Sequence, residues 1–188
     1  STLVFGWEWH TDTSHLEIPP LGSVLAARIL PSVGGDTLFA NQYMAYDTLS
    51  SGMKEMLKDL RAVHSNGRIL ASLAVDDILP PGQDCSAQAT LSSVHPVVRT
   101  HPDTGKKALY VNVMHTERFE NMTVSESAPL LKYLYDHATR PEFSCRFRWQ
   151  PGSIAFWDNR CAQHRAMWDY WPHTRSGNRV TIAGDKPV

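Results

Sequence analysis

Short apolar runs closed by turn residues recur along the chain and predict strands. The run SVLAARIL at 23–30 ends at Pro31, and GGDTLFAN at 34–41 opens with a glycine turn. Compact runs of this kind are typical of buried strands. The segments HPVVRTHP and KKALYVNV, joined by Asp103-Thr104-Gly105, predict a β-hairpin. Three more strand-like segments follow towards the end of the chain: FSCRFRWQ, SIAFWDN and NRVTIAGD.

One longer amphipathic helix is predicted within residues 123–140. Thr123 and Glu126 have the spacing of a capping box, although Ser127 before Pro129 is an equally suitable cap. Apolar residues then recur on one face of the helix. They are Leu130, Leu131, Leu134, Tyr135 and Ala138.

The remaining stretches complete the predicted organisation. Residues 42–60 have helical spacing broken near Ser50-Ser51-Gly52, which predicts two short helices. Residues 65–92 are weakly patterned, and such a stretch inside a compact domain is typically a lid loop or disordered; a lid loop is expected here. Many short strands with few helices favour a mostly β fold with helical insertions, either a β-sandwich or a jelly roll. With 188 residues and no internal repeat, the chain is expected to form a single domain over 1–188.

Composition and charge exclude several function classes. The net charge is −1 and the pI is near 6.7, so neither nucleic acid nor a membrane surface is an expected partner. A transmembrane helix needs about 20 consecutive apolar residues, and no apolar run in the sequence approaches that length. The start, STLVFGWEW, lacks the basic region of a signal peptide. Three widely spaced cysteines without a CxxC motif suit reduced thiols, which predicts a cytoplasmic protein, and a homo-oligomer stays open.

His10 and Asp12 stand two positions apart in the aromatic stretch GWEWHTDTSH at 6–15. In a strand, both side chains would project to the same face. A histidine nitrogen and a carboxylate oxygen are two of the three ligands of a non-haem Fe(II) facial triad, although the motif alone is common by chance. Among the nine histidines, His164 is the best candidate for the third ligand, because WDNRCAQHR places it just after an apolar strand.

Two arginines that follow His164 in the chain could bind the carboxylate of an organic acid held at the metal. Three protein ligands leave three octahedral positions open, of which a bidentate 2-oxo acid takes two and O₂ takes one. A distal carboxylate on such an acid needs a cation, and the planar fork of arginine matches it. Arg175 and Arg179 lie 11 and 15 residues beyond His164, and their separation of four puts them on one face of a strand or helix.

Six segments, in order and over almost the whole chain, match the motifs of one enzyme family. They are WHTD (9–12), GGDTLF (34–39), AYDTLS (45–50), HPVVRTHPDTGKKALYVN (95–112), RPEFSCRFRWQPGSIAFWDNRCAQH (140–164) and GDKP (184–187). In these segments the chain resembles the taurine dioxygenase / 2,4-dichlorophenoxyacetate dioxygenase family of Fe(II)- and 2-oxoglutarate-dependent enzymes. The resemblance is closest to the taurine and alkylsulfatase dioxygenases. It implies a double-stranded β-helix, a jelly roll with the iron at one mouth.

The resemblance also implies roles for individual residues. The metal ligands and catalytic residues would be His10, Asp12 and His164. The distal carboxylate of 2-oxoglutarate would bind to Thr37 and Arg175. The implied reaction hydroxylates a small organic anion, such as a sulfonate, an alkyl sulfate or an aryloxyalkanoate. It consumes O₂ and releases succinate and CO₂.

The substrate side departs from the pattern of the taurine enzymes. The resemblance implies that Arg179 holds the anionic group of the substrate and that Trp157 lies close to the metal. Where the taurine enzymes have an asparagine, a phenylalanine and another aromatic residue, this chain has Gly6, His115 and His15. Those positions line the substrate side in the taurine enzymes, so taurine itself is not the expected substrate.

Two alternatives stay open on the sequence alone. The same His-Asp-His set could serve a zinc hydrolase through a metal-bound water, although Arg175 and Thr37 would then have no role. Only nine residues precede His10, whereas family members usually carry a further N-terminal region, so the chain is expected to be a fragment or a truncated fold. A truncated jelly-roll module that binds a carboxylate ligand or a partner subunit, without catalysis, is the second alternative.

Overall fold

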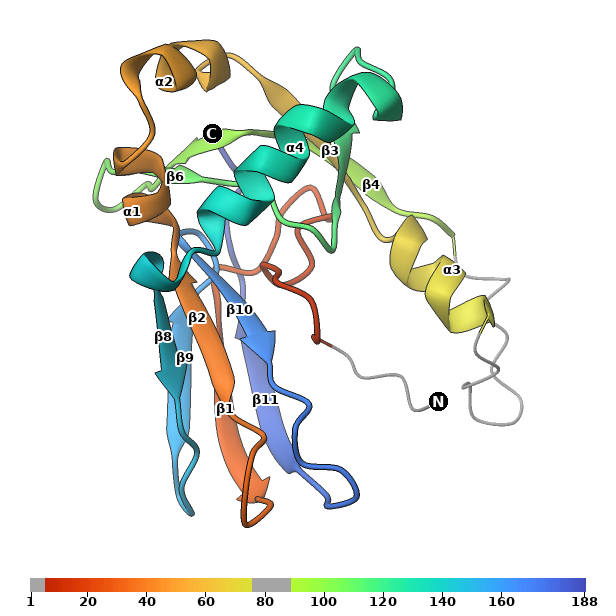
Figure 1. Ribbon diagram of the computed structural model, residues 1–188, viewed down its shortest axis with the longest axis vertical. Coiled ribbons are helices and arrows are strands. Elements are labelled where there is room, and N and C mark those ends of the chain that lie inside the picture. The colour runs from red at the N-terminus through yellow and green to blue at the C-terminus, as the bar shows by residue number, and fades with distance from the viewer. Residues whose placement is uncertain (1–5, 76–88) are drawn as a thin grey trace.

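The computed structural model describes residues 6–75 and 89–188, in which strands predominate (Figure 1). The strands are β1 (Gly22–Ile29), β2 (Thr37–Asn41), β3 (Arg61–Ser65), β4 (Ser92–Pro96), β5 (Val98–Thr100), β6 (Lys107–Leu109), β7 (Thr116–Phe119), β8 (Ser144–Phe147), β9 (Ile154–Asp158), β10 (Ala162–Ala166) and β11 (Ser176–Ile182). The helices are α1 (Gln42–Asp47), α2 (Ser51–Leu57), α3 (Gly67–Val75), α4 (Val124–Ala138) and the single-turn 3-10 helix η2 (Pro141–Phe143).

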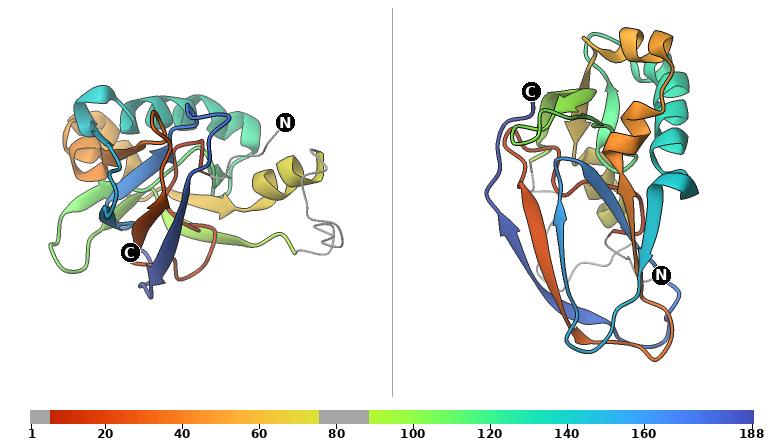
Figure 2. Two further views of the ribbon diagram at one scale, coloured as in Figure 1. Left: turned by 90° about the horizontal axis from the view of Figure 1, so that it is seen from below. Right: turned by 90° about the vertical axis from the view of Figure 1, so that its left-hand side faces the viewer.

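Two three-stranded antiparallel sheets face each other as layers (Figure 2, right). In one sheet β1 lies between β11 and β9, and in the other β2 lies between β10 and β8. Phe39 of β2 and Trp157 of β9 meet between the layers, with ring centroids 5.6 Å apart. Because successive side chains of a strand point to opposite faces, each strand sends every second residue into the space between the sheets. Side chains that are distant in the sequence therefore share this space.

A hydrophobic core lies beside the two layers, where α4 packs against β7 and α1 (Figure 1). The predicted capping box is confirmed: Thr123 Oγ1 accepts from the Glu126 amide, and the Glu126 carboxylate accepts from the Thr123 amide. Ser127 is not the cap, because its hydroxyl accepts from the amide of Phe119 in β7. The buried apolar residues of this core are Ala45, Leu49, Leu57, Ala62, Val97, Val98, Leu109, Val111, Phe119, Leu131, Leu134, Ala138 and Phe143.

Several local predictions from the sequence are confirmed. The strands expected at 23–30 and 34–41 form β1 and β2. The helical stretch 42–60 divides into α1 and α2, and Ser50 caps the second helix through its hydroxyl. The expected hairpin is the antiparallel pair β5–β6. None of the helices in the described ranges has the length and the apolar run that a membrane span requires.

The lid loop predicted over 65–92 is wrong at its beginning. Ser65 ends β3, and Gly67–Val75 form helix α3. The segment GRILASLAV contains repeated leucine and alanine and no proline, and these residues favour a helix. Residues 76–88 lie outside the described part of the chain, so a lid function stays a prediction.

Gly184, in the GDKP segment, lies where two stretches of backbone come close together. A β-carbon there would stand 2.1 Å from the carbonyl oxygen of Pro19 and 2.5 Å from the amide nitrogen of Leu21. Because backbone atoms cannot move away as a flexible side chain does, we expect Gly184→Ala to lower the free energy of unfolding by about 3 kcal/mol, near the upper end for overpacking. Urea denaturation measures this loss.

The matched control for this change is Gly52→Ala in helix α2. Apart from its chain neighbours and the backbone of its own helix, no described heavy atom lies within 4 Å of the β-carbon position of Gly52. Alanine favours a helix more than glycine does, so this variant should gain up to about 1 kcal/mol. Equal denaturation midpoints for the two variants would contradict the tight packing of Gly184.

Candidate functional site

His10 and His164 are joined through their backbones. The His10 amide donates to the His164 carbonyl over 3.1 Å, and the His164 amide donates to the His10 carbonyl over 2.8 Å. Their ring centroids are 4.1 Å apart. Asp12 Oδ1 stands 3.8 Å from His10 Nε2 and 3.7 Å from His164 Nε2. The structure thus brings the three predicted ligands together, and all three are buried.

The segment that carries His10 and Asp12 forms no strand beyond a single bridge residue, so the same-face geometry of a strand does not apply to it. Beyond the single bridge to His164 the chain turns at once, and Thr13 takes a positive φ of 45°. His164, in contrast, lies within its own strand, β10, opposite Phe39 of β2. The sequence pattern did not predict that strand.

The chemistry of the three donors fits a divalent metal ion. His10 Nδ1 donates to the Glu8 carbonyl over 2.8 Å, which leaves a free lone pair on Nε2. Burial lowers the pKa of His10 and lowers the pKa of His164 to about 3, so both rings are neutral at pH 7, as metal ligands must be. Adjacent ligands about 2.1 Å from an octahedral ion lie about 3 Å apart, so only a small approach of the side chains is needed.

Asp12 divides its contacts between its two oxygens. Oδ2 accepts from Ser23 Oγ over 2.7 Å and from Asn159 Nδ2 over 3.4 Å. Oδ1 faces the two imidazoles and accepts from Arg179 Nη1 over 3.1 Å. Burial acts to raise the pKa of Asp12, but the Ser23 hydroxyl and the Arg179 guanidinium lower this pKa below its ordinary value. Asp12 is therefore ionised at neutral pH.

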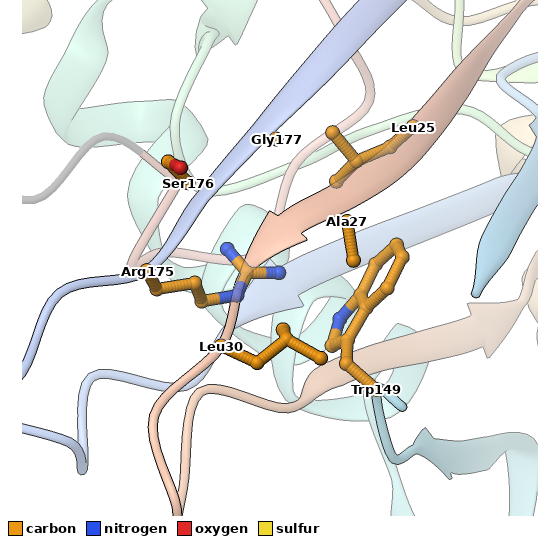
Figure 3. A pocket seen from close by; sticks show the side chains of 7 residues that line it. All are labelled: Leu25, Ala27, Leu30, Trp149, Arg175, Ser176 and Gly177. Atoms are coloured by element: carbon orange, nitrogen blue, oxygen red, sulfur yellow. The ribbon is translucent and has the colours of Figure 1, made fainter. Parts of the chain in front are cut away.

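Arg175 and Thr37 form a second polar group, beside Trp149. Thr37 Oγ1 accepts from Arg175 Nη2 over 3.2 Å and from Trp149 Nε1 over 3.0 Å. The Arg175 guanidinium lies 5.4 Å from the Trp149 ring centroid (Figure 3). Burial lowers the pKa of Arg175, and no carboxylate of residues 6–75 or 89–188 forms a salt bridge with it. Because Thr37 Oγ1 already accepts twice, its hydroxyl hydrogen remains to be donated, so the pair can bind a carboxylate.

One cavity of about 340 Å³ connects the two polar groups. Ligand pockets usually measure about 300 to 1,000 Å³, so this volume suits a small organic molecule. Trp157 lies in its wall, and its ring centroid is 4.7 Å from that of His164. All of the site residues predicted from the sequence line this cavity: His10, Asp12, His164, Thr37, Arg175, Arg179, His15, His115 and Gly6.

The side of the cavity that is predicted to face a substrate contains two neutral histidines and one exposed arginine. The rings of His15 and His115 have centroids 4.9 Å apart, and burial lowers the pKa of both, that of His115 to about 3. The two rings are therefore neutral at pH 7. The side chain of Arg179 is 49% exposed and supplies the positive charge. Gly6 has a φ of +81°, and a β-carbon there would stand 3.2 Å from Cε1 of His10, so glycine lets the backbone pass close to that ring.

Sequence reasoning missed three residues that contact the site. Asn159 belongs to the WDNR motif, so its place beside Trp157 was the only local signal. Ser23 sits in a strand that reads as apolar, and Trp149 follows strand β8 as an ordinary aromatic residue. Neither has a pattern in the sequence that indicates contact with the site.

A second group of side chains, His101, Asp158 and Cys161, also places candidate ligand atoms within 4.8 Å of one another. Its carboxylate is already paired, because Arg160 donates from Nε to Oδ1 over 3.0 Å and from Nη2 to Oδ2 over 2.8 Å. A cation at this place would have to displace the guanidinium. The donor set therefore does not fit a metal ion.

Comparison with known proteins shows the family of the chain. The alpha-ketoglutarate-dependent sulfate ester dioxygenase of Pseudomonas putida is 40% identical over 184 residues, which are 96% of this chain and 60% of that protein. The crystal structure of a taurine dioxygenase from Burkholderia xenovorans has a TM-score of 0.81 at 38% identity, over 100% of this chain and 61% of that one. The crystal structure of AAD-2 in complex with Mn(II) and N-oxalylglycine has a TM-score of 0.84 at 33% identity, over 97% of this chain and 70% of that one.

The chain spans about three fifths of the length of the Pseudomonas and Burkholderia relatives. The family described as "Taurine catabolism dioxygenase TauD, TfdA family" matches residues 2–181, and the chain belongs to this family.

Proposed function

We propose that this chain carries the active site of an Fe(II)- and 2-oxoglutarate-dependent dioxygenase that hydroxylates a small organic anion. One observation carries the proposal: a single cavity contains the His-Asp-His group and also Arg175, a half-buried arginine without a carboxylate partner in the described ranges. Together they suit a metal ion and a dicarboxylate that reaches from the metal to the arginine. The two facing sheets would then be the double-stranded β-helix expected for this class of enzyme.

His10, Asp12 and His164 would hold the iron through two imidazole Nε2 atoms and the Oδ1 atom of the carboxylate. When bound, Fe(II) and 2-oxoglutarate supply the oxidation: one atom of O₂ enters the substrate as a hydroxyl group, and the other enters succinate as CO₂ is lost. With two neutral rings and one carboxylate, the protein leaves one positive charge on the ion. That charge favours the binding of an anionic 2-oxo acid.

Arg175 and Thr37 would bind the distal carboxylate of 2-oxoglutarate. Arg175 supplies a fixed charge and paired N–H donors, and Thr37 adds a hydroxyl donor that Trp149 holds in place. N-oxalylglycine, present with Mn(II) in the AAD-2 crystal structure, has an NH group where 2-oxoglutarate has a CH₂ group. The likeness to that complex supports a 2-oxo dicarboxylate as the cosubstrate.

The proposed substrate is a sulfonate, an alkyl sulfate or an aryloxyalkanoate, with its anionic group on Arg179. Arg179 is the exposed cation of the cavity, whereas His15 and His115 are neutral and would contact the substrate without charge. The names of the Pseudomonas and Burkholderia relatives support an oxidised-sulfur anion. Hydroxylation of the carbon that bears a sulfate ester gives an unstable product. The C–O bond to the sulfate oxygen breaks, its electron pair leaves with sulfate, the new hydroxyl group loses its proton, and an aldehyde remains.

A zinc hydrolase would use the same three ligands with a bound water. It would need neither O₂ nor 2-oxoglutarate, and the carboxylate-binding pair Arg175 and Thr37 would have no role in it. The geometry of this pair therefore favours the dioxygenase.

We expect that Fe(II) and 2-oxoglutarate, added together without oxygen, give the weak visible charge-transfer band of the metal chelate. The band requires the keto oxygen and the adjacent carboxylate on the iron, so glutarate, which has no keto group, serves as the control. Absorption spectroscopy of the anaerobic protein makes the measurement. If the chain binds Fe(II) but gives no band, the dioxygenase proposal is wrong.

Oxygen is then admitted with sulfonates, alkyl sulfates and phenoxy acids in turn. Substrate-dependent succinate identifies the substrate class. Release of sulfate from an ester without O₂ would support the hydrolase instead.

A further inference from the structure

We propose that Ser23 and Asn159 are positioning residues that reserve one oxygen of Asp12, Oδ1, for the metal ion. This inference rests on the proposed function of the site as a metal centre. Both residues donate to Oδ2, whereas Oδ1 faces the Nε2 atoms of the two histidines and accepts from Arg179 Nη1 over 3.1 Å. The two carboxylate oxygens of Asp12 are thus held in different surroundings by the protein itself.

Ser23 is held by the sheet on both sides. It lies in β1 opposite Trp157 of β9 and Thr181 of β11, and it is 0% exposed. A carboxylate only accepts hydrogen bonds, so the Ser23 hydroxyl must be the donor. Its 2.7 Å distance to Oδ2 of Asp12 is typical of a hydrogen bond strengthened by charge. This contact fixes the side of the carboxylate that points away from the histidines.

The side-chain amide of Asn159 has one orientation that satisfies its partners. Its Oδ1 accepts from Trp157 Nε1 over 3.0 Å, and an indole nitrogen can only donate. Its Nδ2 must therefore face Oδ2 of Asp12, which lies 3.4 Å away. The backbone amide of Asn159 donates to the Leu21 carbonyl over 2.8 Å. The turn after β9 is tied in this way to the chain that leads into β1.

The consequence for the metal is a carboxylate that binds through one oxygen. A carboxylate bound through both oxygens would occupy two of six octahedral positions, and only two would remain. A bidentate 2-oxo acid and O₂ together need three. With Oδ2 engaged by two donors, Asp12 presents Oδ1 alone and the third position stays available.

Mn(II) binding tests this role, because it reports on the ligands without requiring turnover. The free-ion electron paramagnetic resonance signal of Mn(II) disappears as the ion binds. We expect Ser23→Ala to raise the Kd for Mn(II) by about 10- to 100-fold, the usual effect of removing an outer partner of a ligand. Asn159→Ala should change the Kd in the same direction. In a separate titration with Fe(II), 2-oxoglutarate should bind both variants more weakly.

Ser127→Ala is the matched control for the loss of a buried hydroxyl. Ser127 is also 0% exposed, and its hydroxyl forms two hydrogen bonds, with the Phe119 amide and the Thr123 carbonyl. It lies in α4 and does not line the cavity. This variant should lose stability and keep the Mn(II) affinity of the unsubstituted chain.

The outcomes separate this inference from the proposed function. If Ser23→Ala and Asn159→Ala fold as well as the control and bind Mn(II) with unchanged affinity, the inference is overturned and the metal centre stands. Asn159→Ala removes the other donor to the same oxygen of Asp12, so it decides the matter if Ser23→Ala does not fold. If the unsubstituted chain binds no Mn(II), the proposed function is overturned, and this inference with it.

Discussion

Replacing His164 by alanine is expected to lower substrate-dependent succinate formation by about a thousand-fold or more. His164 places one of the three metal-facing atoms, 3.7 Å from Asp12 Oδ1. Without it only His10 and Asp12 remain, and two ligands hold the ion weakly and leave the position of 2-oxoglutarate undefined. Mn(II) binding should be lost together with turnover. Both quantities are measured on the same preparation, by the electron paramagnetic resonance signal and by succinate analysis.

His137→Ala is the control for removing a buried imidazole. His137 and His164 are both 7% exposed, and His137 Nε2 donates to the Ala45 carbonyl over 2.7 Å, outside the cavity. This control should lose stability but keep its Mn(II) affinity and most of its turnover. If His164→Ala loses turnover yet binds Mn(II) as tightly as the unsubstituted chain, His164 is not a ligand.

The sequence predicted the fold best where local pattern decides the structure. Strand β1 and the Thr123–Glu126 capping box follow from residues close together in the chain, and both are confirmed. Strand β10 was not predictable, because Ala162–Ala166 reads AQHRA and has no apolar alternation. It forms through its pairing with β2 and through the bridge from His164 to His10. These are contacts between distant parts of the chain.

The same distinction applies to the site. That His10, Asp12, His164 and the two arginines line one cavity could be predicted, because they stand in motifs of fixed order. The partners of those residues could not. Ser23 lies 11 positions from Asp12, Asn159 lies 147 positions from it, and Trp149 lies 112 positions from Thr37. Contacts over such separations depend on how the two sheets face each other, which no local pattern reveals.

The two arginines are expected to separate cosubstrate binding from substrate binding. Arg175→Met should weaken 2-oxoglutarate binding about a hundred-fold, because it removes the half-buried charge that would pair with the distal carboxylate. Arg175→Lys should have a 2-oxoglutarate affinity between those of the unsubstituted chain and Arg175→Met, since lysine keeps the charge without the planar fork. Arg179→Ala should weaken substrate binding about ten-fold, because that side chain is half exposed. It should leave 2-oxoglutarate binding almost unchanged.

Anaerobic titration of the charge-transfer band measures the affinity for 2-oxoglutarate. The KM for substrate reports the change in substrate binding. Arg179 also donates to Oδ1 of Asp12 over 3.1 Å, so the metal affinity of Arg179→Ala must be measured first. We expect that affinity to stay the same or to rise, because a cation that competes for the same oxygen has been removed. If metal, 2-oxoglutarate and substrate affinities all fall equally, Arg179 holds Asp12 in place and does not bind the substrate anion.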